Sequence, residues 1–349
     1  MKSEEGEAAP HPYRWWVLGG VWLVYFCFGL STMSMAPLVV PIVADLNMSY
    51  AEMGMVLGGW QLIYILTAAP CGAFIDRWGP RAGLMLSALF VAASGFLRAD
   101  ASDFWTLFAA VMVFGIGGPM VSIGAPKLIS LWFKGQERGT AMGIYITGPA
   151  TGGIVSFSLT NSLLMPLTDH DWRAVLVIYA GSALVCCGLW LFISAHPAAR
   201  AVERELKAQP REPQLKVFAM LLRLRSVQFV LLMSVGIFFF NHGLNNWLPE
   251  LLRHSGISAA EAGIWASIPT AVGIAGALMI PRLATPNRRF AILAGLFMAA
   301  GLASLLLLTG DPTLMTIGLV AQGVARSSMM AVMILLLVEI KDIGSRYAG

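Results

Sequence analysis

Charged residues are scarce in this chain. Only 12% of its 349 residues are Asp, Glu, Lys or Arg, whereas soluble domains carry about 25%. Hydrophobic residues make up 57% of the chain, and its mean hydropathy is +0.73. This composition excludes a soluble protein and predicts an integral membrane protein.

The chain also has few cysteines, which excludes a disulfide framework. Cys27, Cys71, Cys186 and Cys187 all fall inside apolar segments and lack the spacing of metal ligands. We interpret them as small packing residues and expect no metal and no cofactor. No paired acids, histidine cluster, or nucleophile and base stand at catalytic spacing, so we expect that the protein is not an enzyme.

Long apolar runs make up most of the sequence. Each is long enough to cross a bilayer as a helix, and none alternates as a β-barrel strand would. We therefore expect an all-α polytopic membrane protein with ten spanning helices. Their expected ranges are 15–35, 51–73, 82–99, 104–131, 138–161, 173–195, 227–248, 259–281, 288–308 and 313–340.

Basic residues are distributed unequally between the two sides of these spans. If the amino terminus is inside, 18 Lys and Arg residues lie in inner segments and 3 in outer segments. The positive-inside rule then predicts a multi-pass protein of the inner (plasma) membrane with a cytoplasmic amino terminus. The net charge of +4 follows from this topology, so we expect no nucleic-acid partner.

A charged segment between the second and third apolar runs is the most specific motif. It reads Gly-Ala-Phe-Ile-Asp-Arg-Trp-Gly-Pro-Arg at 72–81. Its charges would be costly in hydrocarbon, so we expect a turn at the membrane surface, with Gly-Pro ending one helix and starting the next. The candidate gating residues in this segment are Gly72, Asp76, Arg77, Gly79 and Arg81.

The pattern G-x-x-x-D-R-x-G-x-R resembles the signature loop between helices 2 and 3 of the major facilitator superfamily. One departure is Pro80, which replaces the first residue of the usual terminal basic pair. The resemblance implies two six-helix halves that alternate in access, with Asp76 helping to latch the cytoplasmic side shut. We expect a monomer in the lipid bilayer.

An internal repeat agrees with two halves. Residues 49–54 and 258–263 both read S-x-A-E-x-G at an offset of 209, and each serine and glutamate could form a capping box. Independent origin of the two boxes remains an alternative. The predicted divisions are an N-terminal half at 1–195, a cytoplasmic linker at 196–226 and a C-terminal half at 227–349. The same offset predicts that helices 11 and 12 would follow Gly349, so the sequence looks truncated.

The fifth apolar run carries a second motif. Gly148, Pro149, Gly152 and Gly153 match the G-P-x-x-G-G motif of helix 5 in major facilitator exporters, where it is often tied to antiport. We count these four residues among the gating candidates. The alternative is that they only bend the helix and allow close packing.

Arg326 is the most informative single residue, because it stands at the centre of the last apolar run. A cation at the bilayer centre costs about 2.5–3.5 kcal/mol on insertion scales, so it should face a polar site with a partner. No Asp or Glu is expected near the same depth. We therefore predict that the partner is an anionic substrate; the alternative is that Gln322, Ser327 or helix carbonyls satisfy the guanidinium.

Further polar residues inside the spans complete the candidate substrate site. Asn241, His242 and Asn245 share one face of a helix, and His242 is the default candidate for proton coupling. Lys127 either contributes to the site or extends to the cytoplasmic surface. The remaining substrate-site candidates are Ser31, Gln61, Tyr64, Tyr145 and Gln322.

The end of the seventh run resembles the cyanate and nitroimidazole branch of the superfamily. The segments are Asn-Trp-Leu-Pro-Glu-Leu-Leu from residue 246 and Gly-Ile-Ser-Ala-Ala-Glu-Ala-Gly from residue 256. That branch implies small anions moved with protons. We predict a secondary active transporter of a small anion, with protons as a candidate coupling ion. The alternatives are a proton-antiport exporter of drugs or metabolites, and a transporter-like receptor or assembly factor that does not translocate.

Overall fold

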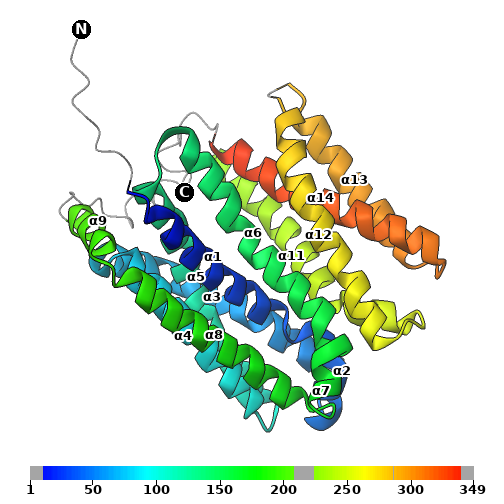
Figure 1. Cartoon of the computed structure of the whole chain (residues 1–349). Coiled ribbons are helices and arrows are strands. Elements are labelled where there is room, and N and C mark those ends of the chain that lie inside the picture. The colour runs from blue at the N-terminus through cyan, green and yellow to red at the C-terminus, as the bar shows by residue number, and fades with distance from the viewer. Residues whose placement is uncertain (1–10, 208–223, 286, 339–349) are drawn as a thin grey trace.

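The computed structural model describes residues 11–207, 224–285 and 287–338, and helices account for most of them. The long helices run side by side, with α9 at one end of the bundle and α2 and α7 at the opposite end (Figure 1). The elements are α1 (Arg14–Met33), η1 (Ala36–Leu38), α2 (Val39–Asp45), α3 (Tyr50–Trp78), α4 (Pro80–Ala99), α5 (Phe104–Trp132), α6 (Gly135–Leu159), η2 (Thr160–Leu164), α7 (Met165–Leu167), α8 (Trp172–Ser194), α9 (Pro197–Lys207), α11 (Arg225–His254), α12 (Ala259–Leu283), α13 (Arg289–Leu307) and α14 (Pro312–Val338).

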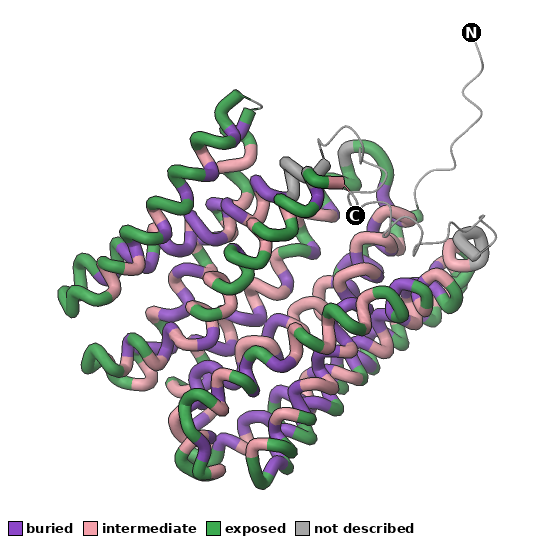
Figure 2. The backbone as a smooth tube through the Cα atoms, turned by 180° about the vertical axis from the view of Figure 1, so that it is seen from behind, coloured by how far each residue is buried: buried purple, intermediate pink, exposed green. Residues whose placement is uncertain are grey.

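The all-α prediction is confirmed, and each of the ten predicted spans corresponds to one long helix. Within the described residues, eight helices are long and apolar enough to cross a membrane. Exposed positions of the backbone gather on the outside of the bundle, and buried positions lie where helices run next to one another (Figure 2). The exposed side chains include many large apolar residues, as expected for a surface that lipid covers.

Two predicted helix boundaries are wrong. The charged segment at 72–81 is not a turn: α3 continues to Trp78, and only Gly79, with φ of 91°, separates α3 from α4. Likewise α11 does not end at residue 248 but continues through Pro249 to His254. A proline removes one helical hydrogen bond, yet Leu248 and Leu252 on either side of it are buried in an apolar cluster that holds the helix together.

The helices pack as two groups. Helices α1 to α8 contact one another, and so do α11 to α14, while α6 packs against both α1 and α12. The groups meet toward the α2 end, where Asn161 Nδ2 donates to the carbonyl of Ala259 at 3.4 Å and the rings of Tyr50 and Trp247 lie 6.1 Å apart. The division at 195 and 227 stays a prediction, and residues 208–223 of the predicted linker lie outside the described residues.

The two repeated capping segments differ in detail. Ser49 and Glu52 form a full capping box, with the Ser49 N–H donating to the Glu52 carboxylate at 2.7 Å. Ser258 accepts from the Glu261 N–H, but the Glu261 carboxylate accepts from the Ser258 hydroxyl at 2.7 Å instead of from its N–H. The second predicted box is therefore only half formed.

A close contact between two helices occurs once in each group of helices, at positions related by the same repeat. The Cα of Gly115 on α5 lies so close to the Trp60 carbonyl on α3 that an added Cβ would stand 2.5 Å from that oxygen. In the other group, a Cβ on Gly323 of α14 would collide with the Pro269 carbonyl on α12. Both pairs are related by nearly the same offset as the capping segments, which favours duplication over independent origin.

Candidate functional site

Arg326 lies near the middle of α14 and is 4% exposed. Its Nη1 donates to Asn245 Oδ1 at 2.9 Å and to the Asn241 carbonyl at 3.3 Å, both on α11. Its Nε has no hydrogen-bond partner, and within the described residues the guanidinium forms no ion pair. The expectation that no carboxylate meets Arg326 thus agrees with the geometry, and part of its donor capacity remains free.

His242 lies one residue beyond Asn241 and connects α11 to α3. Its ring contacts Trp60 edge-to-face, with centroids 5.5 Å apart, and stacks on Phe238 at 5.7 Å. Asn241 and Asn245 therefore contact Arg326, whereas His242 contacts the Trp60 ring on α3. We call Arg326, Asn241, Asn245, His242 and Trp60 the polar junction.

Gln322, one turn before Arg326, is turned away from the polar junction. Its Nε2 donates to the Ala300 carbonyl at 2.9 Å and to Ser304 Oγ at 2.6 Å on α13. The alternative that Gln322 satisfies Arg326 is therefore wrong. Gln322 and Arg326 stand one turn apart on α14, yet the Gln322 side chain extends to α13 and the Arg326 side chain extends to α11.

The candidates on the first group of helices lie around an aromatic cluster. Trp60 packs edge-to-face on Tyr64 at 6.0 Å, and neighbouring Gln61 has a buried Oε1 without a hydrogen-bond partner. Tyr145 on α6 meets Tyr25 on α1 at 5.5 Å. Tyr64 therefore lies beside the ring that His242 contacts, while Tyr145 contacts the tyrosine of α1. Sequence reasoning missed Trp60, and its position one residue before Gln61 was the available signal.

Ser31 is joined to a buried arginine in the last turn of α4. Arg98 is 3% exposed; its Nη1 donates to the Ser31 carbonyl at 3.1 Å, and its guanidinium lies over Phe114 at 5.0 Å. Arg98 is buried because the last turn of α4 faces Ser31 of α1 and Phe114 of α5. Since α1 ends at Met33, Arg98 stabilises a carbonyl near the break that precedes η1.

The signature segment forms an ion pair within its own group of helices. Lys127 Nζ on α5 lies 2.5 Å from Asp76 Oδ1 on α3, and both side chains are partly exposed. The structure thus brings Lys127 to Asp76 and not to the polar junction. Lys127 therefore pairs with Asp76, the acid of the signature segment.

The rest of this segment contacts the helix that follows the sixth span. Arg81 Nη1 lies 2.7 Å from Glu203 Oε2 on α9, and the Arg77 guanidinium lies over the Trp78 ring at 5.7 Å. Gly79 faces the Glu203 side chain, leaving no room for a Cβ, and Gly72 is buried on α3. The signature residues therefore form one charged surface at the α9 end.

The glycines of the helix 5 motif lie against α1. A Cβ on Gly148 would stand 2.9 Å from the Trp22 carbonyl, and one on Gly152 would collide with the Phe26 carbonyl. Pro149 makes the reciprocal contact, because its carbonyl fills the space beside Gly29. Gly153 meets only the end of the Met33 side chain. Close packing of α6 on α1 is thus sufficient to explain the motif.

Replacing Gly152 with Ala should strongly destabilise the protein, because the backbone of α1 cannot move away as a flexible side chain could. Overpacking of this kind costs about 1–3 kcal/mol. Gly143→Ala on the same helix is the matched control, since nothing lies within 4 Å of its added Cβ. Thermal unfolding in detergent should show a lower Tm for Gly152→Ala only. Equal Tm values for both variants would contradict the packing explanation.

Comparison with known proteins agrees with this arrangement. A sequence model of the Major Facilitator Superfamily matches residues 21–344. The structure resembles a bacterial homologue of the human lysosomal transporter Spinster in an inward-facing, unoccupied conformation. The TM-score is 0.77, with 19% identity, 97% of this chain and 78% of that chain covered. The likeness at this identity concerns the fold.

Two bacterial relatives are more similar in sequence to this chain than the Spinster homologue is. A probable L-galactonate transporter of Escherichia coli K12 is 27% identical over 77% of this chain and 63% of its own length. The probable galactarate/D-glucarate transporter GarP of the same strain is 25% identical over 68% of this chain and 59% of its own length. The chain therefore spans about 60% of the length of these two relatives. The family and both relatives are transporters, in agreement with the prediction that the chain is not an enzyme.

Proposed function

The chain belongs to the Major Facilitator Superfamily, and from this premise we propose that it is part of a secondary active transporter for a small organic or inorganic anion. The observation that carries the proposal is Arg326, a buried guanidinium with a free Nε and no acidic partner among the described residues. A planar cation of this kind suits a carboxylate or another small oxyanion. Asn245 and the Asn241 carbonyl orient it without neutralising it.

The names of the relatives support a negatively charged substrate, but they differ in which substrate they name. Both are named for the anions of sugar acids, galactonate in one case and galactarate and glucarate in the other. The sequence resemblance to the cyanate and nitroimidazole branch also implies an anion. We propose a small carboxylate or related anion, and Gln61, Tyr64 and Tyr145 as the groups that contact its uncharged part.

We propose alternating access around the polar junction, in a multi-pass protein of the inner membrane with the α9 end in the cytoplasm. The α9 end carries most of the basic residues, as the positive-inside rule requires of a cytoplasmic face. The contacts between the two helix groups toward the α2 end then correspond to an outwardly closed state. Export remains the second candidate direction of transport. The helix 5 motif is weak support for export, because close packing of α6 on α1 alone explains that motif.

Uptake into liposomes tests the proposal and its coupling ion. We expect a small carboxylate to accumulate when the interior is more alkaline, and we propose that His242 carries the proton. His242→Gln should then abolish uphill accumulation but keep counterflow exchange, because exchange requires only reorientation of the loaded carrier. His254→Gln, an exposed histidine on the same helix, is the control and should keep both activities.

Two results would contradict parts of this scheme. If uphill uptake by His242→Gln equals that of the wild type, His242 does not carry the proton. If the protein moves no anion in either assay, the result favours the alternative that it is a receptor or assembly factor and not a transporter.

A further inference from the structure

A groove on the surface of the first helix group has no role in the scheme above. It is an open hollow between the end of α4 and the start of α8. Its volume of about 510 Å³ falls in the range of about 300–1,000 Å³ typical of small-molecule sites. α4 and α8 lie on the side of the bundle opposite α13, away from the second helix group (Figure 1). The groove therefore opens toward lipid.

The walls of the groove change from polar to apolar along the helix axes. Asp100, Asp171 and Arg173 line it where α4 ends and α8 begins. Phe96 and Ile178 line its deeper part and are 37% and 44% exposed. Ile178 is six residues beyond the start of α8, about 9 Å deeper at 1.5 Å per residue. A polar rim over an apolar wall at this spacing matches a lipid headgroup above its acyl chains.

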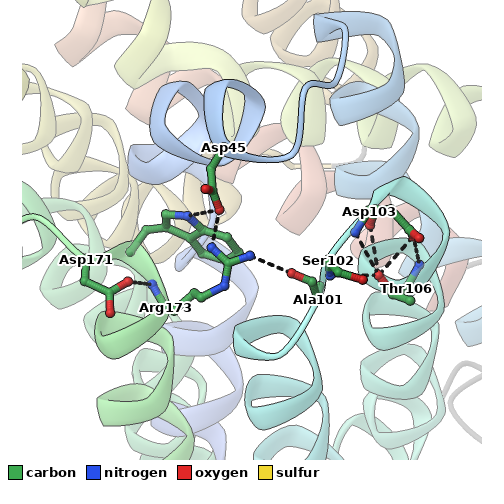
Figure 3. Close-up of polar contacts among 8 residues, drawn as sticks. Asp45, Ala101, Ser102, Asp103, Thr106, Asp171 and Arg173 are labelled. Atoms are coloured by element: carbon green, nitrogen blue, oxygen red, sulfur yellow. Dashed lines mark hydrogen bonds and ion pairs between the residues drawn. The ribbon is translucent and has the colours of Figure 1, made fainter.

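The rim residue Arg173 is held rigidly. Its guanidinium contacts Asp45, donates through Nη2 to the Ala101 carbonyl at 2.7 Å, and lies over the Trp172 ring at 4.2 Å (Figure 3). Arginine has five N–H donors, and these contacts use the two Nη atoms, so donor capacity remains on a side chain that is 34% exposed. The fixed guanidinium can donate an additional hydrogen bond to a phosphate oxygen.

The two rim carboxylates are available for a cation. Asp171 Oδ1 accepts from the Arg173 backbone N–H at 2.8 Å, which leaves its second oxygen free (Figure 3). Asp100 is exposed, and its carboxylate forms no hydrogen bond or ion pair within the described part of the chain. The rim thus carries one cation, which is paired with Asp45, and two further carboxylates, a charge pattern that disfavours a lipid with a net negative charge.

We propose that this groove binds an aminophospholipid of the phosphatidylethanolamine type. Its phosphate lies against Arg173, its primary ammonium donates to Asp100 and Asp171, and its acyl chains follow Phe96 and Ile178. A phosphatidylcholine headgroup has no N–H donor for the carboxylates, and a phosphatidylglycerol headgroup has no cation for them. The primary ammonium is therefore the feature that selects the lipid.

Native mass spectrometry of the purified protein with equal amounts of the three lipids tests this site. The wild type should retain phosphatidylethanolamine in preference to the other two. Ala174→Trp, which fills the groove, should lower this adduct by about tenfold or more, the loss expected for a charge-assisted hydrogen bond. Leu189→Trp, an exposed position on α8 outside the groove, should leave the adduct unchanged.

A second variant, Asp100→Asn, adds no bulk and tests the proposal even if Ala174→Trp does not fold. Asp100→Asn should reduce the preference for phosphatidylethanolamine over phosphatidylcholine, whereas Asp169→Asn, an exposed acid in the loop before α8, should not. Equal retention of all three lipids by the wild type would overturn the proposal. So would a wild-type lipid preference in a folded Ala174→Trp or in Asp100→Asn.

Discussion

Arg326→Gln should nearly abolish substrate binding and uptake while leaving the protein folded. Removing one partner of a buried, hydrogen-bonded charge pair costs about 2–5 kcal/mol, which corresponds to about 30-fold or more in affinity. The folded state should not suffer equally, because the guanidinium is buried without an acidic partner in the described residues and its charge is costly there. Uptake by membrane vesicles at matched expression measures the first effect, and Tm in detergent the second.

Arg326→Lys separates charge from shape. It keeps the positive charge but loses the planar set of donors that Asn245 and the Asn241 carbonyl orient, so binding should weaken without disappearing. Arg282→Gln, an exposed arginine in the last turn of α12, is the matched control and should transport normally. If Arg326→Gln transports an anion at the wild-type rate, Arg326 is not the anion site.

Asp76→Asn should impair transport far more than it impairs folding. The ion pair with Lys127 is partly exposed, so its direct contribution to stability is small. In the proposed cycle Asp76 also meets groups of the other helix group when the cytoplasmic side closes, and loss of that contact shifts the balance between the two states. Couplings of 1–3 kcal/mol change such a balance by about 5- to 150-fold. Initial uptake rates at equal expression measure the effect.

The double variant Asp76→Asn, Lys127→Gln distinguishes a latch from a local ion pair. If Asp76 serves only to neutralise Lys127, removing both charges should restore wild-type uptake. If Asp76 has a second partner in the other state, the double variant should remain as slow as Asp76→Asn. Glu137→Gln, which breaks the exposed ion pair with Arg14 at the same end, is the control. Wild-type uptake by Asp76→Asn itself would exclude a latch.

The sequence predicted the spans well because hydrophobicity and length determine them almost alone. All ten apolar runs are helices, and Gly79 followed by Pro80 separates α3 from α4. Within the described residues Arg326 has no acidic partner, and the distribution of Asp and Glu along the spans indicated this. The depth of a residue in the membrane follows from its number of residues from the end of the span.

Contacts between helices were not predictable, because they depend on how each helix is rotated about its axis. Lys127 was a candidate for the substrate site but faces Asp76, and Gln322 faces α13 although it stands one turn from Arg326. The burial of Arg98 against the Ser31 carbonyl of α1 depends in the same way on the rotation of α4. The contact of His242 with Trp60 joins two helices far apart in sequence, and no local pattern indicates it.

The most direct test of the account is calorimetric titration of wild-type protein and Arg326→Gln with charged and uncharged ligands of the same shape. Galactonate and galactarate serve as the anions, with cyanate as a minimal anion, and galactitol is the uncharged polyol. The account predicts that the wild type binds at least one of the anions and not galactitol, and that Arg326→Gln loses this binding. Equal binding of galactitol and the anions, or unchanged anion affinity in a folded Arg326→Gln, would contradict it.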